Sequence, residues 1–430
     1  MKLSSINLNS AREIYIERIS RFFAVRDSSI TTLLIYIVRN IHSPYKNIKY
    51  LPIKWLDEVE NAGKTLLRKG GKGLAFHPNF NEKQNNTSNV QLPDIFCLVV
   101  ANAVVSPTSS SIITNENQVI IERVAGLDQS KVSYSAGQIL SHGVKKALVT
   151  MREATQIEDG IFLGGNGSFN YYHWVVEILP KLQFITDKSF QYKEYPLLLS
   201  DDVAHIQTFK ELLDIFVGGF KVITLNKSKQ YLVRNLVYIN APSNLPFNLR
   251  DGEPFESDYT QISDESIRYI RNTVFASVLS TNQGTAPYPD RVFLCRKQET
   301  RKYNQNEVFG VLEKLSFKKI YMEDLTIREQ VKIAYNASYI VGATGAAWTN
   351  LIFCQEGAKC LCWMAEEYSE FSAYSTIAEI VGVDLRYVSY KANTSSTGEL
   401  YESDYVISTD SIQEGLLRLG LSIDTDRVSV

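Results

Sequence analysis

Short apolar runs alternate with amphipathic segments through most of the chain, and this alternation predicts an α/β protein. Two such regions follow one another. In the first, apolar runs predict β-strands at 161–163, 196–199, 221–225 and 232–239. In the second, they predict strands at 291–295, 319–322, 339–341, 359–363 and 385–389. Because helical segments separate the strands, each region is expected to form a parallel sheet.

Apolar positions spaced three and four residues apart predict the intervening helices. These lie at 203–216, 262–279, 306–315, 326–336, 348–353, 370–381 and 411–419. Thr326 followed by Glu329 is a capping box, which marks a helix start. Residues 243–260 show no apolar period and are read as a crossover between the two regions. The predicted fold is therefore α/β with two facing Rossmann-like domains and a ligand cleft between them.

The chain before the first region has a different pattern. Residues 1–60 look helical, residues 64–90 are rich in Lys, Gly and Asn and read as loop, and residues 93–124 read as a β meander. This makes a small N-terminal helical/β extension. The expected division is 1–92 as the extension, 93–250 as the meander with the first Rossmann-like domain, 260–400 as the second, and 401–430 as a C-terminal helix and tail.

Composition narrows the class of protein. Hydrophobic residues make up 44% of the 430 residues and the net charge is −2, so no bulk electrostatic attraction to nucleic acid is expected. Five scattered cysteines without C-x-x-C pairs argue against a disulfide framework and against a zinc site, and they suit a reducing compartment. No apolar run reaches the roughly 18 residues of a membrane span, and no signal pattern is seen. A cytoplasmic protein is expected.

Basic and apolar residues alternate at 12–23, which leaves two readings of that segment. It could be an amphipathic helix that lies on a membrane surface or on a partner. It could instead pack on its own domain, and Glu13 and Glu17 favour this second reading because they dilute the positive face.

The first candidate site lies at 161–182, where a short apolar run, a glycine-containing loop and a helix follow one another. His173 falls in the first helical turn, and Glu177 four residues later faces the same side. A histidine above the carboxyl end of a strand is suited to proton transfer, so His173 could be a general base. The alternative is a histidine that only orients or caps, with Glu177 as a buried hydrogen-bond partner.

The second candidate site is the small-residue loop at 342–350, which follows a predicted strand. Backbone N–H groups at such a helix start can bind a diphosphate. A tight turn with close helix–strand packing explains the same residues equally well. It is not a P-loop, because no Gly-Lys-Ser/Thr follows.

The third candidate site is a pair of arginines, Arg296 and Arg301, just past the first strand of the second region. Guanidinium groups bind phosphate bidentately. Two solvated surface cations, like Lys297 and Lys302 beside them, are the alternative. The other four histidines lack metal-ligand spacing, so no metal is expected.

These segments together resemble glycosyltransferase family 61. Asn170-Tyr171-Tyr172-His173-Trp174 with Glu177, Pro180 and Leu182 is similar to the family's N-Y-x-H-W-x-x-E-x-x-P-x-L signature. Arg296, Arg301, Asn306 and Glu307 resemble its R…R-x-x-x-N-E run, and Glu323, Leu325, Glu329 and Gln330 the segment that follows. Gly342, Gly345, Ala346, Asn350 and Phe353 match its G-x-H-G-A-x-x-x-N-x-x-F element. The matches keep their order over about 155–365.

The resemblance implies a GT-B architecture and inverting, metal-independent transfer of a sugar from a nucleotide-sugar donor, with no cofactor. His173 and Glu177 would be catalytic, beside an acceptor-side loop containing Gly165, Asn166, Asn170 and Tyr172. The donor would be bound by Arg296, Arg301, Asn306, Thr344, Gly345, Ala346 and Asn350. The chain departs from the family at Thr344, where the motif has histidine.

The same resemblance implies a UDP-sugar donor, a glycan or lipid-linked glycan acceptor, and a role in capsule or other cell-surface polysaccharide biosynthesis. Peripheral contact with the inner membrane and a homo-oligomer stay open. Two other functions remain as alternatives: a pyruvyl or phosphosugar transferase on a similar fold, and a non-catalytic partner subunit. Asp201, Glu253 and Glu256 are alternative bases.

Overall fold

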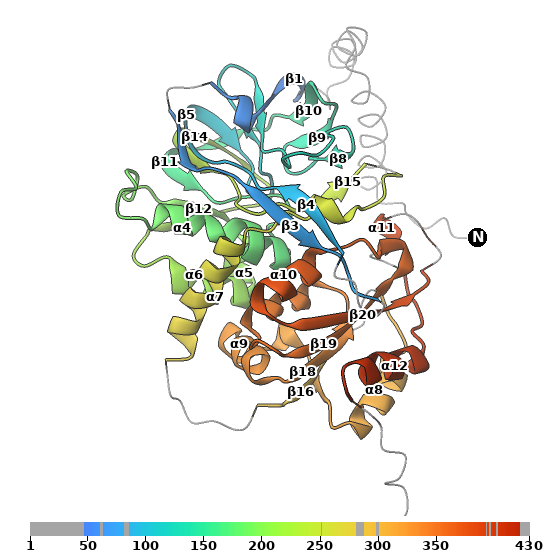
Figure 1. Cartoon of the computed structure of the whole chain (residues 1–430). Helices are drawn as coiled ribbons and strands as arrows, with labels where there is room; N and C mark the ends of the chain where they lie inside the picture. Colours follow the sequence, from blue (N-terminus) through green and yellow to red (C-terminus); the bar gives the residue numbers. More distant parts are fainter. Residues whose placement is uncertain are drawn as a thin grey trace, which may run out of the picture.

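The computed structural model describes residues 47–60, 63–80, 86–250, 252–280, 288–297, 301–392, 394, 397–400 and 403–421. The amphipathic segment predicted at 12–23 lies outside these residues. The described chain is mixed α/β and contains two large sheets, one above the other in Figure 1. Among the described residues, no helix combines the length and hydrophobicity needed to cross a bilayer.

The first sheet has eleven strands, and the four at one end of it are parallel. From the edge inward these four are β13 (Val222–Leu225), β12 (Leu197–Ser200), β11 (Ala154–Phe162) and β14 (Gln230–Ile239). The sheet then continues through β5 (Ile95–Val105), β6 (Ile112–Ile113), β7 (Val119–Ile121), β1 (Ile48–Trp55), β10 (Lys146–Thr150) and β9 (Ile139–His142), and β2 (Lys64–Arg68) also pairs with β5. The pairs in this part are antiparallel except for β7 with β1, which is parallel. The predicted meander is therefore part of the same sheet as the α/β region, because β5 pairs with β14 along most of its length.

The second sheet is parallel throughout. It runs in the order β17 (Lys318–Ile320), β16 (Arg291–Leu294), β18 (Tyr339–Ala343), β19 (Lys359–Ala365) and β20 (Asp384–Tyr390). In sequence order this is 2-1-3-4-5, one of the two common doubly wound arrangements. Ligands of such sheets bind where the strand order reverses, here at the carboxyl ends of β16 and β18.

The predicted helices are present, with ends shifted by a few residues. They are α7 (Asp264–Val278), α8 (Gln305–Lys314), α9 (Ile327–Asn336), α10 (Ala373–Val381) and α12 (Thr409–Arg418). The single helix predicted at 203–216 is two, α5 (Asp202–His205) and α6 (Gln207–Phe216), and α11 (Thr397–Leu400) was not predicted. The capping box is confirmed, since Thr326 and Glu329 bond each other's backbone N–H groups. The segment predicted as a helix at 348–353 is a 3₁₀ helix, η7 (Ala346–Phe353). Four further short 3₁₀ turns are η2 (Leu56–Glu58), η5 (Ser257–Tyr259), η6 (Met322–Asp324) and η8 (Glu366–Tyr368).

One continuous hydrophobic core joins the two sheets. It includes Trp174 behind the first sheet, Ile267 and Ile270 on α7, and Trp348 and Ile377 against the second sheet, all almost fully buried. Trp174 stacks on Phe209 with ring centroids 5.5 Å apart and is almost fully buried, so it is a core residue. The two α/β halves are thus packed on each other.

Two local predictions near the N-terminus were wrong. Ile48–Trp55 is a strand rather than a helix, because its backbone pairs with β7 on one side and β10 on the other. The segment read as loop at 64–90 contains β2 and the hairpin of β3 (Lys72–Phe76) and β4 (Thr87–Gln91). These strands bury few side chains, so their sequence lacks an apolar run.

The β3–β4 hairpin reaches from the first half of the chain onto the second sheet (Figure 1). The N–H of Phe76 donates to Thr376 Oγ1 at 3.0 Å, and the N–H of Tyr387 donates to the Asn79 carbonyl at 2.8 Å. The hairpin therefore ties the N-terminal part of the chain to α10 and β20.

Candidate active site

The loop after β11 is shaped so that His173 can approach the sheet edge. Asn166 is fixed to Ser110 by two hydrogen bonds of 3.0 and 3.1 Å. Gly167 has φ +70°, and a Cβ there would lie 2.8 Å from His173 Cδ2 and 2.7 Å from the Phe247 ring. Only glycine accommodates both the backbone conformation and this close approach. The Asn170 side chain then caps the following helix by accepting the Tyr172 N–H at 2.9 Å.

The helix that carries the site is irregular. A short α turn, α3 (Tyr171–His173), leads into a π turn (Trp174–Ile178), a 3₁₀ turn (Leu179–Lys181) and α4 (Leu182–Ile185). Pro180 has no N–H to donate to the preceding turn, which accounts for the break in the regular bonding there. The sequence predicted a helix here but not its π turn, a feature frequent at functional sites.

His173 and Glu177 form a buried pair, as the spacing predicts. His173 Nδ1 lies 2.8 Å from Glu177 Oε2, and the other oxygen of Glu177 accepts the Leu245 N–H at 2.7 Å. The side chains are only 8% and 12% exposed. With a proton on Nδ1 donated to the carboxylate, Nε2 keeps a lone pair. No described residue bonds Nε2, and His173 lines a cavity. The imidazole is therefore placed to accept a proton from a molecule in that cavity.

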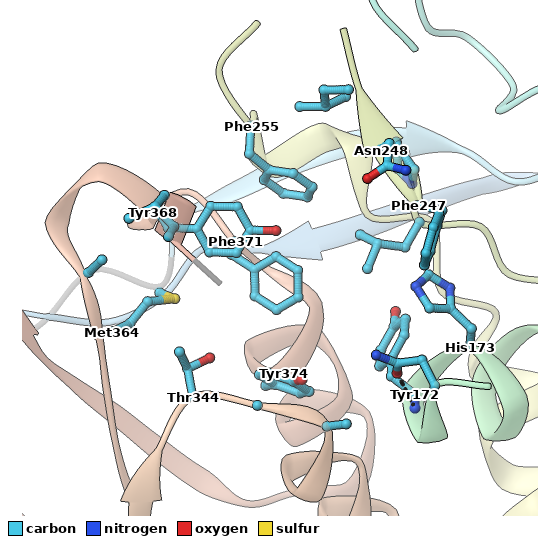
Figure 2. Close-up of a pocket in the computed structure, with 18 of the residues that line it drawn as sticks. Tyr172, His173, Phe247, Asn248, Phe255, Thr344, Met364, Tyr368, Phe371 and Tyr374 are labelled. Carbon is cyan, nitrogen blue, oxygen red and sulfur yellow. Dashed lines mark hydrogen bonds between the residues drawn. The ribbon is translucent and has the colours of Figure 1, made fainter. Parts of the chain in front are cut away.

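The cavity lies between the two sheets. His173, Asn170 and Tyr172 line it from the first sheet, and Arg301 and Thr344 from the second. Figure 2 shows His173 and Thr344 on opposite sides. Tyr172 lines the cavity, and its buried hydroxyl has no hydrogen-bond partner among the described residues. An unsatisfied buried hydroxyl beside a cavity suits a polar ligand.

Aromatic rings form one wall of the cavity. Tyr368 stacks on Phe371 at 4.8 Å, and Phe255 and Tyr374 each lie 5.3 Å from Phe371, measured between ring centroids. Phe247 contacts His173 edge-on across from this wall (Figure 2). The sequence did not predict this wall, because no motif joins Phe247 and Phe255 in the crossover to the aromatic residues near α10. The only signal was the density of aromatic residues at 368–374.

The cavity is small in this conformation. Its volume is about 100 Å³, below the roughly 300 Å³ at which pockets for drug-sized ligands begin. A ligand as large as a sugar nucleotide therefore requires lining side chains to move aside.

Arg296 and Arg301 lie together at the carboxyl edge of the second sheet. Arg296 is held by Gln305, which accepts its N–H at 2.9 Å and donates to its carbonyl at 3.1 Å. Its guanidinium donates to the Thr344 carbonyl. Burial, followed by the charge of Arg301, lowers the pKa of Arg296. Arg301 is 9% exposed, has φ +50° and lines the cavity. Two adjacent guanidinium groups favour an anion between or beside them.

The loop after β18 completes this edge. Thr344, Gly345 and Ala346 line the cavity, and η7 begins directly after Gly345. A Cβ on Gly345 would lie 2.7 Å from Arg296 Nη2, so glycine allows the arginine to cross beneath the loop. The arginines and this loop meet where the strand order of the second sheet reverses.

Other predicted residues lie outside the cavity. Asn350 is 3% exposed, and its amide bonds Tyr171, Gln330 and Ala347. Asn306 is exposed on α8, with Lys319 Nζ 3.4 Å from its side-chain oxygen. Gly165 packs against Ile178, and Asn166 holds the loop. The alternative bases Asp201, Glu253 and Glu256 do not line the cavity either. Within the described residues, no three His, Cys, Asp or Glu side chains gather as metal ligands would.

A comparison with known protein families relates this geometry to a function. The model of the family described as Glycosyltransferase 61 matches residues 171–361, somewhat under half of the chain. The match begins at α3 and ends within β19, so it contains His173, Glu177, both arginines and the Gly345 loop. A comparison with curated proteins found no match. Residues 171–361 of this chain are thus similar to glycosyltransferase family 61, and the match supports a glycosyltransferase.

Proposed function

We propose that the protein is an inverting, metal-independent glycosyltransferase of GT-B architecture that moves a sugar from a nucleotide-sugar donor to a glycan acceptor. One observation carries this proposal. The cavity is lined on one side by His173, which Glu177 holds, and on the other by Arg301 and the Gly345 loop, and the two sides belong to different sheets. A reaction between an acceptor hydroxyl and a diphosphate-activated sugar needs these two chemistries side by side.

On the acceptor side, His173 Nε2 takes the proton of the attacking hydroxyl as its oxygen bonds to the anomeric carbon of the sugar. Glu177 stabilises the imidazolium that forms, and its second hydrogen bond, from the Leu245 N–H, fixes its orientation. Attack opposite to the leaving group inverts the anomeric configuration.

On the donor side, the bond between the anomeric carbon and the diphosphate oxygen breaks, and the diphosphate keeps the electron pair. Arg301 lines the cavity, and Arg296 stands directly behind the loop of Thr344 and Gly345. Two positive charges and the N–H groups at the start of η7 would stabilise the departing diphosphate. This supports transfer that does not depend on a divalent metal.

We further propose a UDP-sugar donor and a lipid-linked or other cell-surface glycan acceptor, in capsule or related polysaccharide biosynthesis. The enzyme would act in the cytoplasm, peripheral to the inner membrane, as a monomer or homo-oligomer. These details rest on the resemblance to family 61.

The test is release of nucleoside diphosphate from a panel of sugar nucleotides, in EDTA, with and without glycan acceptors. Arg301→Met is expected to lower release from the accepted donor by about a hundredfold, as loss of one charge-stabilising group does. Lys297→Met is the matched control, because it removes an exposed cation from the same loop. Release that requires added Mg²⁺ would contradict metal-independent transfer. Turnover of phosphoenolpyruvate in place of sugar nucleotides would point to a pyruvyl transferase. A folded protein that binds no nucleotide would point to a non-catalytic partner subunit.

A further inference from the structure

A buried lysine and a buried glutamate lie close enough to the His173–Glu177 pair to interact with Glu177 electrostatically. Lys181 follows Glu177 by four residues and is 1% exposed, although it carries an amine. Its Nζ lies 3.5 Å from the Gly164 carbonyl and 5.3 Å from the centre of the Tyr238 ring. A fully buried lysine is rare unless it is paired with opposite charge.

Glu122, directly after β7, is linked to Lys181 through Tyr238, whose hydroxyl lies against Glu122 and whose ring lies near the Lys181 amine. One oxygen of Glu122 accepts the Tyr238 hydroxyl at 2.7 Å, and the other accepts the Ala241 N–H at 2.8 Å. The Tyr238 hydroxyl also lies 2.9 Å from the Ser110 carbonyl, so Glu122, Tyr238 and Ser110 form one buried hydrogen-bonded group. Burial raises the pKa of Glu122, and the charge of Lys181 opposes that shift.

Lys181 interacts with both carboxylates. Burial lowers the pKa of its amine, while Glu122 and then Glu177 oppose the change. The order of groups is therefore Glu122, Lys181, Glu177 and His173, with alternating sign once the imidazole is protonated. Before proton uptake the four groups carry a net charge of minus one, and afterwards they are neutral.

We propose that Lys181 and Glu122 are positioning residues, which balance the charge of Glu177 and so decide at what pH His173 takes up a proton. The proposal rests on His173 acting as the base of the proposed reaction. The other groups facing this cluster are the hydroxyls of Tyr172 and Tyr238, Tyr374 on α10, and Arg301 across the cavity.

Two substitutions test the idea in opposite directions. Lys181→Met removes a positive charge, so a proton binds the pair more readily, and the acid limb of kcat/KM should move to higher pH by about one unit. Glu122→Gln removes a negative charge, and the limb should move to lower pH. Lys181→Arg keeps the charge and should leave the limb near that of the wild type. A residue that served only packing would lower activity or stability without moving the limb.

The same shifts can be read without any turnover. The whole chain has five histidines, so NMR of protein labelled in histidine gives few signals, and His173→Gln identifies that of residue 173. Opposite displacement of this titration in Lys181→Met and Glu122→Gln would support the proposal, even if no sugar donor were found. Midpoints within about 0.2 pH unit of the wild type in both folded variants would overturn it, since a nearby charge moves them further.

Discussion

At the residue scale, the candidate site depends on a few close approaches. His173 and Glu177 face each other because residues four apart share a helix face, which is why this pair was predictable. The Leu245 N–H that holds Glu177 comes from the crossover segment, 68 residues away. This contact was not predictable from the sequence. The aromatic wall of the cavity and the burial of Lys181 were not predictable either, since both depend on the fold.

Gly167 allows the close approach of its backbone to His173 and Phe247, and Gly167→Ala tests whether this approach matters for turnover. The new Cβ would meet both His173 and Phe247 and force the imidazole aside. We expect turnover to fall by about a hundredfold, as a displacement of about 1 Å can cause. Gly252→Ala is the matched control, because Gly252 also has a positive φ but faces open space. Equal activity in the two variants would show that the position of His173 is not critical.

At the element scale, strands were predictable where both faces are covered. β16, β18 and β19 are buried and read as apolar runs. β2, β3 and β4 were not predicted, because they bury few side chains and so have no apolar run. Backbone hydrogen bonds alone mark them as strands. A helix in the second half of 161–182 was predicted, but the π and 3₁₀ turns found there were not.

The cap of α9 gives a prediction about stability. Thr326→Ala should lower the free energy of unfolding by about 1 kcal/mol, because it removes the acceptor of the Glu329 N–H. Hydrogen bonds from Thr326 also lower the pKa of Glu329 below its usual 4.5. The carboxylate's contribution is thus present above that value and is lost as the pH falls through the folded-state pKa. Urea unfolding should show a smaller difference from the wild type at pH 3 than at pH 7.

At the scale of the whole molecule, the cavity exists only because two sheets meet. The alternation of strands and helices predicted both parallel regions, while the eleven-stranded extent of the first sheet and the β3–β4 hairpin depend on contacts distant in sequence. The small cavity volume indicates that the two sides or their side chains must separate for a large donor to enter.

The hairpin contact should stabilise the packing of the two halves. Thr376→Val leaves the Phe76 N–H without its acceptor and should cost about 1–3 kcal/mol in the free energy of unfolding. Thr155→Val, exposed on β11, is the control and should change it by less than about 0.5 kcal/mol. If both variants unfold at the same urea concentration, the hairpin does not contribute to holding the halves together.

The most direct test of the proposed reaction compares His173→Gln with the wild type, using the donor that the release assay identifies. Two quantities are measured: kcat for sugar transfer, and the Kd of the nucleoside diphosphate by calorimetry. Loss of a general base predicts a kcat lower by about 10²- to 10⁴-fold with Kd unchanged, because the diphosphate would bind the opposite side of the cavity. A variant that keeps the wild-type kcat, or one whose whole defect lies in nucleotide binding, would contradict His173 as the base of a glycosyltransferase.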